Sequence, residues 1–365
     1  AAASTGGQIM PPIMGAAAFL MAEFIGVPYA RVALSAVIPA ILYFTGVGIG
    51  VHLEARRTGL RGLAADKVPR LGRVLRERGL LLIPVLGLII IMTTGATPTK
   101  AALAGILLGL IVSSFSPRTR IKPKDILDAL EEGARGALGV AAATAAAGMI
   151  VGSVTLTGLG LKMANGLVAL AHGNLLLTMF FTMIASLILG MGSPTTANYV
   201  ITSTISAPAL VHLGVPVLAA HMFVFYFGII ADLTPPVALA AYAGAGIAKG
   251  DPMATGVNAT KLAIGAFLVP YIFVLSPQLL LINVTLLGAF RVALGAIIGM
   301  LSLEAAIQGW LLKEASILER LALAAGGLLL IEPGILTDII GLTLFGVVYF
   351  VQYTSARRQG ITYIL

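Results

Sequence analysis

Residues 215–248 read VPVLAAHMFVFYFGIIADLTPPVALAAYAGAGIA, two apolar runs on either side of the break ADLTPP at residues 231–236. Proline removes a backbone donor and clashes with the preceding turn, so Pro235 and Pro236 should end the first helix. We therefore expect the carbonyls of residues 231–234 to lack partners. Unpaired carbonyls at membrane depth can ligate cations. The stretch predicts one membrane crossing built of two half-helices.

The start of the chain repeats this design, because residues 4–12 read STGGQIMPP and an apolar run follows at residues 13–24. If the basic segment after His52 is cytoplasmic, the number of crossings predicts that the first broken helix runs out of the cytoplasm and the second runs toward it. The two repeats are thus predicted to be inverted, and Pro11 and Pro12 correspond to Pro235 and Pro236. By this symmetry we expect a first hairpin before residue 1, and the absence of an initiating Met also suggests a missing N-terminal portion.

Between the two broken helices, apolar residues 174–189 and 197–213 flank the segment GMGSPTT at residues 190–196. Neither arm is clearly long enough to span a bilayer, so the pattern predicts a re-entrant hairpin broken at Pro194. Polar groups near the tip and a half-helix N-terminus suit a carboxylate. The candidate solute ligands are Ser193, Thr195, Thr196 and Asn198. The alternative, that these groups only cap the helix beginning near Ala197, stays open.

Composition indicates a membrane environment for the whole chain. Of 365 residues, 58% are apolar and 10% are charged, and the mean hydropathy is +1.01. Apolar runs of about twenty residues match the thickness of the hydrocarbon core. The fold class we predict is an all-α polytopic membrane protein, an inverted-repeat transporter with broken helices. The absence of cysteine excludes thiolate sites, and the four histidines lack metal spacing, so no metal beyond a coupling cation is expected.

Loop charge sets the predicted topology. Twelve of the 23 basic residues fall in two segments, which the positive-inside rule places in the cytoplasm. They are Arg56, Arg57, Arg61, Lys67, Arg70, Arg73, Arg76, Arg78, Arg118, Arg120, Lys122 and Lys124. Because these residues lie in short loops between apolar spans, the net charge of +8 does not indicate nucleic-acid binding.

The predicted organisation has five parts: residues 1–52 end the first repeat, 53–78 form a basic loop, and 79–158 form scaffold and arm helices. Residues 159–283 form the second repeat, with the hairpin at 174–213, the broken helix at 215–248 and a span at 262–282. Extra membrane helices occupy residues 284–365. There, Glu332-Pro333-Gly334 splits residues 321–351 into either one kinked span or a hairpin.

A few ionisable residues fall within or near the spans. Asp232 lies inside an apolar crossing, where it either takes part in cation coupling or serves structural pairing. Glu23, Arg291 and Glu304 lie near span ends, where snorkelling or interface pairing is the commoner explanation.

Three motifs resemble the large membrane subunit of the tripartite ATP-independent periplasmic (TRAP) transporters, most closely the fused permeases of the TAXI branch. They are ASTGGQIMPP at residues 3–12, GMGSPTTANY at 190–199 and FGIIADLTPPVA at 227–238. The resemblance covers about residues 1–281. The tail through Trp310 and residues 332–334 is similar to the extra C-terminal region of fused TAXI subunits.

The resemblance implies an elevator mechanism in a bacterial or archaeal inner membrane. It also implies import of a small carboxylate, delivered by a periplasmic binding protein and coupled to Na⁺ or H⁺. A small membrane subunit or its fused equivalent is a further implied partner, and no organic cofactor is expected. Carried over by position, Ser4, Thr5 and Gly6 belong to one cation site. The second site takes Gly190, Gly192, Ala231, Asp232 and Thr234.

Two other functional classes compete with a transporter. A channel or passive pore would line an open pathway with the broken helices. An intramembrane enzyme needs a nucleophile with a base, yet residues 190–194 read G-x-G-S-P rather than the G-x-S-x-G of a hydrolase elbow. The chain also lacks a phosphate-binding loop, so its energy source would be an ion gradient or a partner ATPase.

Overall fold

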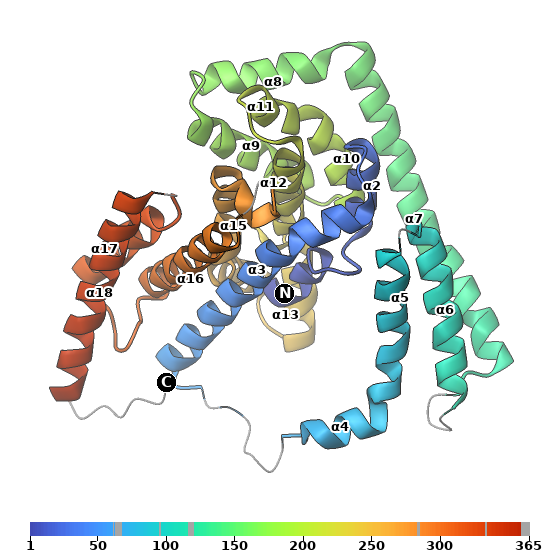
Figure 1. The fold of residues 1–365 in the computed structure, drawn as a ribbon, viewed down its shortest axis with the longest axis horizontal. Coiled ribbons are helices and arrows are strands. Elements are labelled where there is room, and N and C mark those ends of the chain that lie inside the picture. Colours follow the sequence, from blue (N-terminus) through green and yellow to red (C-terminus); the bar gives the residue numbers. More distant parts are fainter. Residues whose placement is uncertain are drawn as a thin grey trace.

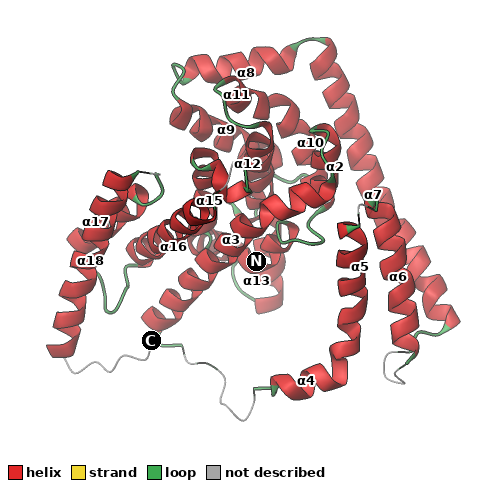
Figure 2. Cartoon of the chain, viewed as in Figure 1, coloured by secondary structure: helices red, strands yellow, loops and turns green. Residues whose placement is uncertain are grey.

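A computed structural model describes residues 1–60, 62, 68–94, 96–115, 120–282, 285–332 and 334–358. Within these ranges every regular element is a helix, and the one β feature is an isolated bridge between Trp310 and Glu314 (Figure 2). Four helices, or up to five if a bent pair counts as one, are long and apolar enough to cross a membrane. The predicted all-α polytopic membrane class is confirmed. Arg61, Lys67, Arg118 and Pro333 lie outside the described residues.

The first part of the chain is an interrupted helix followed by a long span. A short helix and a 3-10 turn come before Pro11 and Pro12, and the helix resumes after Gly15. The long span continues five residues beyond the predicted start of the basic loop, so that loop begins later than expected. The elements are α1 (Ala2–Thr5), η1 (Gly6–Gln8), α2 (Ala16–Phe24) and α3 (Tyr29–Thr58).

In the middle of the chain, helices α4 to α7 lie on the right of Figure 1, and α8 runs across the top. Two apolar helices in this region pack against each other, one long continuous helix covers residues 123–156, and a further helix covers residues 159–170. The elements are α4 (Leu71–Arg78), η2 (Gly79–Leu82), α5 (Ile83–Thr93), α6 (Pro98–Ser114), α7 (Pro123–Leu156) and α8 (Leu159–Leu170).

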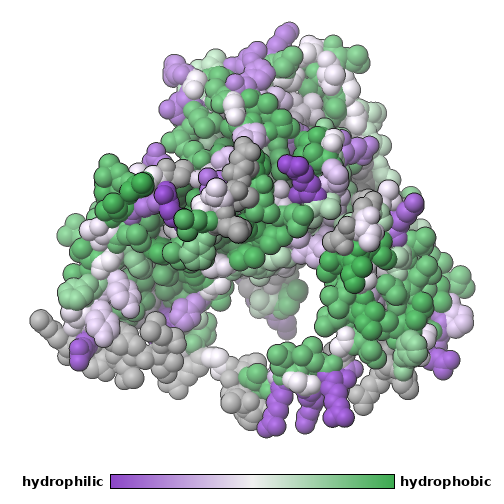
Figure 3. Space-filling view, viewed as in Figure 1, coloured by the Kyte–Doolittle hydropathy of each residue, from purple (hydrophilic) through white to green (hydrophobic). Residues whose placement is uncertain are grey.

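The surface of this region matches a membrane setting. Hydrophobic residues cover α5 and α6 in the space-filling view, while hydrophilic residues gather below α4 (Figure 3). Arginines at positions 70, 73 and 76 alternate with the exposed Leu71, Val74 and Leu75 along that helix. Such a two-faced basic helix is typical of a position at the membrane interface.

Residues 175–248 contain a second interrupted helix. Two helical arms meet at a turn, and the next helix stops at a 3-10 turn before Pro235 and Pro236. The arms are α9 (Leu175–Gly190), α10 (Thr195–Ile205) and α11 (Ala207–His212), and the interrupted helix comprises α12 (Val217–Ile230), η3 (Ala231–Leu233) and α13 (Leu239–Ala248). The Pro11-Pro12 and Pro235-Pro236 peptide bonds are both cis.

A single span was predicted at residues 262–282, but the helical segment begins earlier, at residue 252, and is bent. Helices α14 (Pro252–Leu262) and α15 (Ile264–Leu275) meet at an angle of 42°, and η4 (Pro277–Leu280) follows. Helices α15 and α3 touch through glycines, because a Cβ on Gly265 would lie 3.2 Å from the Cα of Gly46. Close backbone contact through small residues is a usual way for membrane helices to pack.

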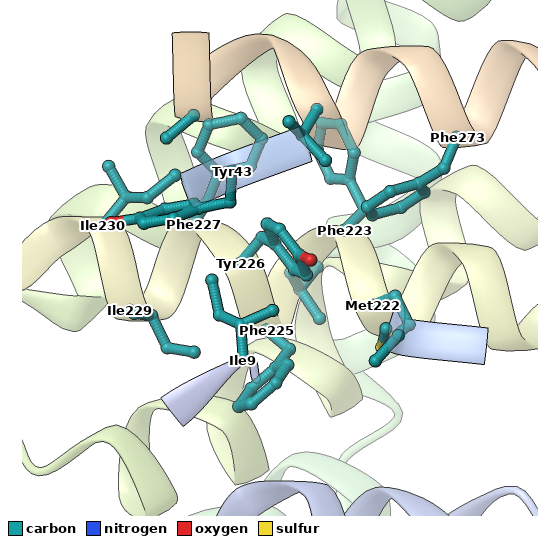
Figure 4. Packing of buried hydrophobic residues seen from close by; sticks show 14 of the residues in the cluster. Ile9, Tyr43, Met222, Phe223, Phe225, Tyr226, Phe227, Ile229, Ile230 and Phe273 are labelled. Carbon is teal, nitrogen blue, oxygen red and sulfur yellow. The ribbon is translucent and has the colours of Figure 1, made fainter. Parts of the chain in front are cut away.

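Helix α12 forms the centre of the molecule. Its residues from Phe223 to Ile230 are almost completely buried, and Figure 4 shows Tyr226 among side chains from several helices, including Tyr43 of α3 and Phe273 of α15. The Tyr226 and Phe273 rings lie 5.4 Å apart in an edge-on arrangement. Since lipid tails are as apolar as these residues, contact between well-fitted side chains holds this core together.

The C-terminal residues form a three-helix unit of α16 (Leu286–Gln308), α17 (Ile317–Leu329) and α18 (Ile335–Arg358). Helices α17 and α18 pack side by side (Figure 1), so residues 321–351 form a hairpin rather than one kinked span. Arg291 of α16 forms an ion pair with Asp338 of α18 at 3.4 Å, which is the interface pairing expected for that arginine.

Replacing Gly341 with alanine should loosen this hairpin. A Cβ at Gly341 would lie 2.8 Å from the carbonyl oxygen of Gly326 and 2.7 Å from Leu330 Cγ. We expect a loss of about 1–3 kcal/mol, as for other overpacked sites, measured as a lower unfolding temperature of the purified protein. Gly346→Ala on the same helix is the control, because a Cβ there meets nothing within 4 Å. Equal stability of the two variants would contradict the packing.

Candidate functional site

The hairpin tip is a tight turn between α9 and α10. Gly192 has a φ of +72°, a left-handed conformation that favours glycine. The Ser193 backbone N–H donates to the Gly190 carbonyl at 3.3 Å. Pro194 precedes the first residue of α10, where its fixed φ suits the entry to a helix. Gly192 and Pro194 therefore determine the backbone conformation of the tip.

The polar side chains of the tip do not cap α10. Its N-cap residue is Pro194, and no side-chain hydrogen bond caps the helix. Ser193 Oγ points back along the chain and lies 3.3 Å from the Leu189 carbonyl oxygen. Thr195 and Thr196 are partly exposed in the first turn of α10. The capping alternative is thus wrong, and the N-terminus of α10 remains suited to an anion.

Asn198 lies deeper, where the hairpin meets the interrupted helix. Its side chain is completely buried, and neither Oδ1 nor Nδ2 has a hydrogen-bond partner among the described residues. A Cβ on Gly190 would lie 2.4 Å from Asn198 Nδ2, and one on Gly228 would lie 2.7 Å from it. The same Cβ on Gly190 would lie 2.6 Å from Ala231 Cβ. We call Gly190, Asn198, Gly228 and Ala231 the tip–break junction.

An unpartnered amide in this position needs a physical reason. Burying an amide without a hydrogen bond costs about 1–3 kcal/mol. The two glycines provide room for the Asn198 amide between the end of α9 and the end of α12. Solute contact was predicted for this residue, but in this arrangement the side chain has no surface facing a solute.

The second break satisfies more of its carbonyls than the sequence indicated. The Ala231 carbonyl accepts the Thr234 backbone N–H at 3.2 Å, and the Leu233 carbonyl accepts the Thr260 hydroxyl at 3.0 Å. The prediction that the carbonyls of residues 231–234 are unpaired is therefore wrong for Ala231 and Leu233. The Ala231 carbonyl is satisfied because a local turn forms, and the Leu233 carbonyl is satisfied by a hydroxyl group of α14. Thr234 Oγ1 itself donates to the Ile230 carbonyl at 2.9 Å.

Asp232 is partly buried in η3, within this break. Its carboxylate forms no hydrogen bond or ion pair within the described part of the chain. Structural pairing was one of the two alternatives for Asp232. The described ranges contain no partner that would support it. A carboxylate at membrane depth without a partner is the kind of group that marks an ion pathway.

The first break is organised by tyrosines. Tyr43 Oη donates to the Ala2 carbonyl at 2.9 Å, and Tyr29 Oη lies 2.9 Å from the Pro12 carbonyl oxygen and 2.7 Å from that of Ile13. A Cβ on Gly6 would lie 2.6 Å from Tyr43 Cε1, so only glycine fits there. These tyrosines were not recognised from the sequence, because nothing near them marks a contact with the break.

The structure places the first break beside the second. Helix α1 contacts η3 and α13, so the segment with Ser4 and Thr5 lies against the elements that follow the tip–break junction. Ser4 is exposed, whereas Thr5 is buried and donates its hydroxyl to the Ala1 carbonyl at 3.1 Å. At the tip, a Cβ on Gly192 would lie 3.5 Å from Val237 Cγ1. Residues of the two helix breaks thus lie around one central region.

Comparison with known proteins gives a family match for most of the chain. Residues 1–287 match the family model described as tripartite ATP-independent periplasmic transporter, DctM component. No curated protein and no solved structure matches the chain. The match covers both breaks and the hairpin and ends at the start of α16. The chain belongs to the DctM family, the large membrane component of TRAP transporters.

Proposed function

We propose that this protein is the membrane subunit of a secondary active transporter that imports a small organic acid by an elevator mechanism. A periplasmic binding protein, a partner of TRAP transporters in general, would deliver the solute to the inner membrane. The observation that carries the proposal is the tip–break junction. There a fully buried, unpartnered Asn198 amide faces two glycines, at the point where the hairpin meets the interrupted helix.

The junction favours a sodium ion as the coupling cation. Neutral oxygens and freed backbone carbonyls are the usual ligands of sodium in transporters with broken helices. The Asn198 amide oxygen and the nearby Asp232 would supply such ligands, together with the Gly190 and Ala231 carbonyls, each of which also accepts one backbone N–H. A bound cation would also provide the partner that the buried amide lacks. The other cation site is proposed to lie at the first break, with Ser4, Thr5 and Gly6.

The tip favours a carboxylate solute. Ser193, Thr195 and Thr196 are partly exposed hydroxyl residues, and they surround the N-terminus of α10. A helix N-terminus carries partial positive charge and backbone donors that suit an anion.

An elevator requires a block that slides against a scaffold. We assign α1–α3 and α9–α15 to the transport block, and α5–α7 to the scaffold. A cavity of ≈ 300 Å³ lies between them, lined by Pro11, Pro12, Ala30, Ala33, Leu34 and Val37 of the block and by Ile89 and Met92 of α5. The cavity leaves this part of the interface apolar and incompletely filled, which is compatible with sliding, whereas elsewhere α10 of the block packs closely on α7 of the scaffold.

No specific observation favours the competing functions. A pore requires the broken helices to line an open pathway, whereas α12 is the most deeply buried helix. A hydrolase requires an activated hydroxyl, whereas Ser193 Oγ is directed to main-chain carbonyls of α9.

Uptake into proteoliposomes tests the proposed function. The protein is reconstituted with its periplasmic binding protein, and sodium and proton gradients are imposed separately. We expect accumulation of the carboxylate with an inward sodium gradient and none when both gradients are collapsed. Equal uptake with and without gradients would support a passive pore and contradict the proposal.

Replacing Thr195 and Thr196 with valine should weaken solute uptake. Each change removes a hydroxyl of the tip while keeping the shape of the side chain. Loss of one hydrogen bond to an anion costs about 1.5–3 kcal/mol, so we expect the half-saturating solute concentration to rise by about tenfold or more. Thr343→Val is the control, because its exposed hydroxyl bonds only to the Ile339 carbonyl on α18. Unchanged uptake kinetics in both tip variants would exclude the tip as the solute site.

A further inference from the structure

A second buried polar site lies away from the hairpin, on helix α16. Glu304 lies near the end of α16, as expected, but the snorkelling explanation is wrong for it, because its side chain is completely buried. It lies beyond residue 287, where the DctM match ends. The residue therefore needs an explanation that the transport site does not provide.

Glycines of two other helices make room for this carboxyl group. A Cβ on Gly50 of α3 would lie 2.9 Å from Glu304 Oε2 and 3.1 Å from the Leu262 carbonyl oxygen. Gly265 donates its backbone N–H to Glu304 Oε1 at 3.2 Å. That donor belongs to the first turn of α15, just after the bend between α14 and α15, where helix N–H groups lack intrahelical partners. The carboxyl group thus sits where three helices meet.

The carboxyl group has one donor and no counter-charge. Glu304 Oε2 forms no hydrogen bond in the described residues. The Gln308 side chain, one turn further along α16, lies close to the carboxyl group, but its Nε2 is outside hydrogen-bond distance of any described acceptor. An ionised carboxylate in this position would leave a charge almost uncompensated in an apolar interior.

The charged groups on the surrounding helices are directed elsewhere. On α3, Arg31, His52 and Arg56 are exposed, and Glu54 is bonded to Arg57. Lys261 of α14 is exposed, and α15 carries no acidic or basic residue. On α17, Glu319 accepts from Ser316 and Gln352, while Arg320 donates to the Ala306 and Ile307 carbonyls. On α16 itself, Arg291 is paired with Asp338.

We propose that Glu304 is a proton-binding site of the membrane domain, formed by α3, the α14–α15 bend and α16. With a proton on Oε2 the group is neutral, and both Oε2 and the Leu262 carbonyl oxygen, a hydrogen-bond acceptor, lie close to Gly50. Oε1 continues to accept the Gly265 N–H. Loss of the proton places a charge between α16 and two helices of the transport block, so proton binding at Glu304 controls how α16 packs on that block.

Infrared difference spectroscopy on the full chain in lipid nanodiscs tests this site without measuring transport. A step from neutral to strongly alkaline pH should reveal the carbonyl band of a protonated carboxyl group that loses its proton. We expect Glu304→Gln to lose this band, since its amide keeps an oxygen for Gly265 and cannot titrate. Glu23→Gln is the control, because Glu23 is exposed.

Three outcomes would overturn the proposal. They are absence of the band in the wild-type protein, its persistence in Glu304→Gln, and its removal by sodium at constant pH, which would make this a sodium site. If Glu304→Gln does not fold, Glu304→Asp replaces it, and the band should remain at a shifted frequency. An unshifted band in that variant would contradict the assignment. These spectra do not depend on uptake, so they test the Glu304 site independently of the proposed function.

Discussion

Uptake should fall by about 100-fold when Gly190 is replaced with alanine. The added methyl group would lie 2.4 Å from Asn198 Nδ2 and 2.6 Å from Ala231 Cβ, distances that real Cβ atoms do not adopt. The hairpin tip must then separate from the second break. Overpacking costs about 1–3 kcal/mol, and the upper end corresponds to about a hundredfold weaker cation binding. The measurement is the initial rate of sodium-driven uptake in proteoliposomes.

The control for this variant is Gly166→Ala on α8, where a Cβ meets nothing within 4 Å. We expect Gly166→Ala to transport at the wild-type rate. Both proteins should elute as folded material in size-exclusion chromatography. A Gly190→Ala protein with unchanged uptake would mean that the tip–break junction takes no part in transport.

Replacing Asp232 with asparagine should uncouple transport from the cation gradient. The change keeps the size of the side chain and removes its charge, which no described residue compensates. A charged contact contributes about 1.5–3 kcal/mol, so gradient-driven uptake should fall by about tenfold or more. The measurement is solute accumulation at a series of sodium gradients.

Asp128→Asn is the control for this experiment, because Asp128 is exposed on α7 and does not cap that helix. Its dependence on the sodium gradient should equal that of the wild type. If Asp232→Asn keeps the same dependence, Asp232 has no role in coupling.

The helix interruptions were the most predictable features of the fold. The expected tip at residues 190–196 agrees with α9 ending at Gly190 and α10 beginning at Thr195, within two residues. The second break begins at residue 231, as expected, and extends to residue 238, two residues beyond the predicted end. Proline and glycine act locally on the backbone, so their effects can be inferred without knowledge of tertiary contacts.

Features that depend on distant contacts could not be predicted. The Leu233 carbonyl is satisfied by Thr260, and the Ala2 carbonyl by Tyr43, partners separated by 27 and 41 positions. Burial of Asn198 and Glu304 likewise depends on glycines of other helices. The segment Glu332-Pro333-Gly334 suits both a kink and a turn, and only the packing of α17 on α18 decides between them.

Disulfide cross-linking tests the elevator account most directly, because the chain contains no cysteine. Val151 of α7 and Val200 of α10 pack in one cluster across the boundary between scaffold and transport block. Within the block, a Cβ on Gly256 would lie 3.4 Å from Ala238 Cβ, close to the separation in natural disulfides. The double variants are Val151→Cys with Val200→Cys, and Ala238→Cys with Gly256→Cys.

The measurement is uptake by each oxidised double variant, before and after reduction. Oxidation should stop uptake in the Val151–Val200 variant, and a reductant should restore it. The Ala238–Gly256 variant should transport equally well in both states, because its cross-link moves with the block. Full uptake by the cross-linked Val151–Val200 protein would contradict a block that slides against the scaffold.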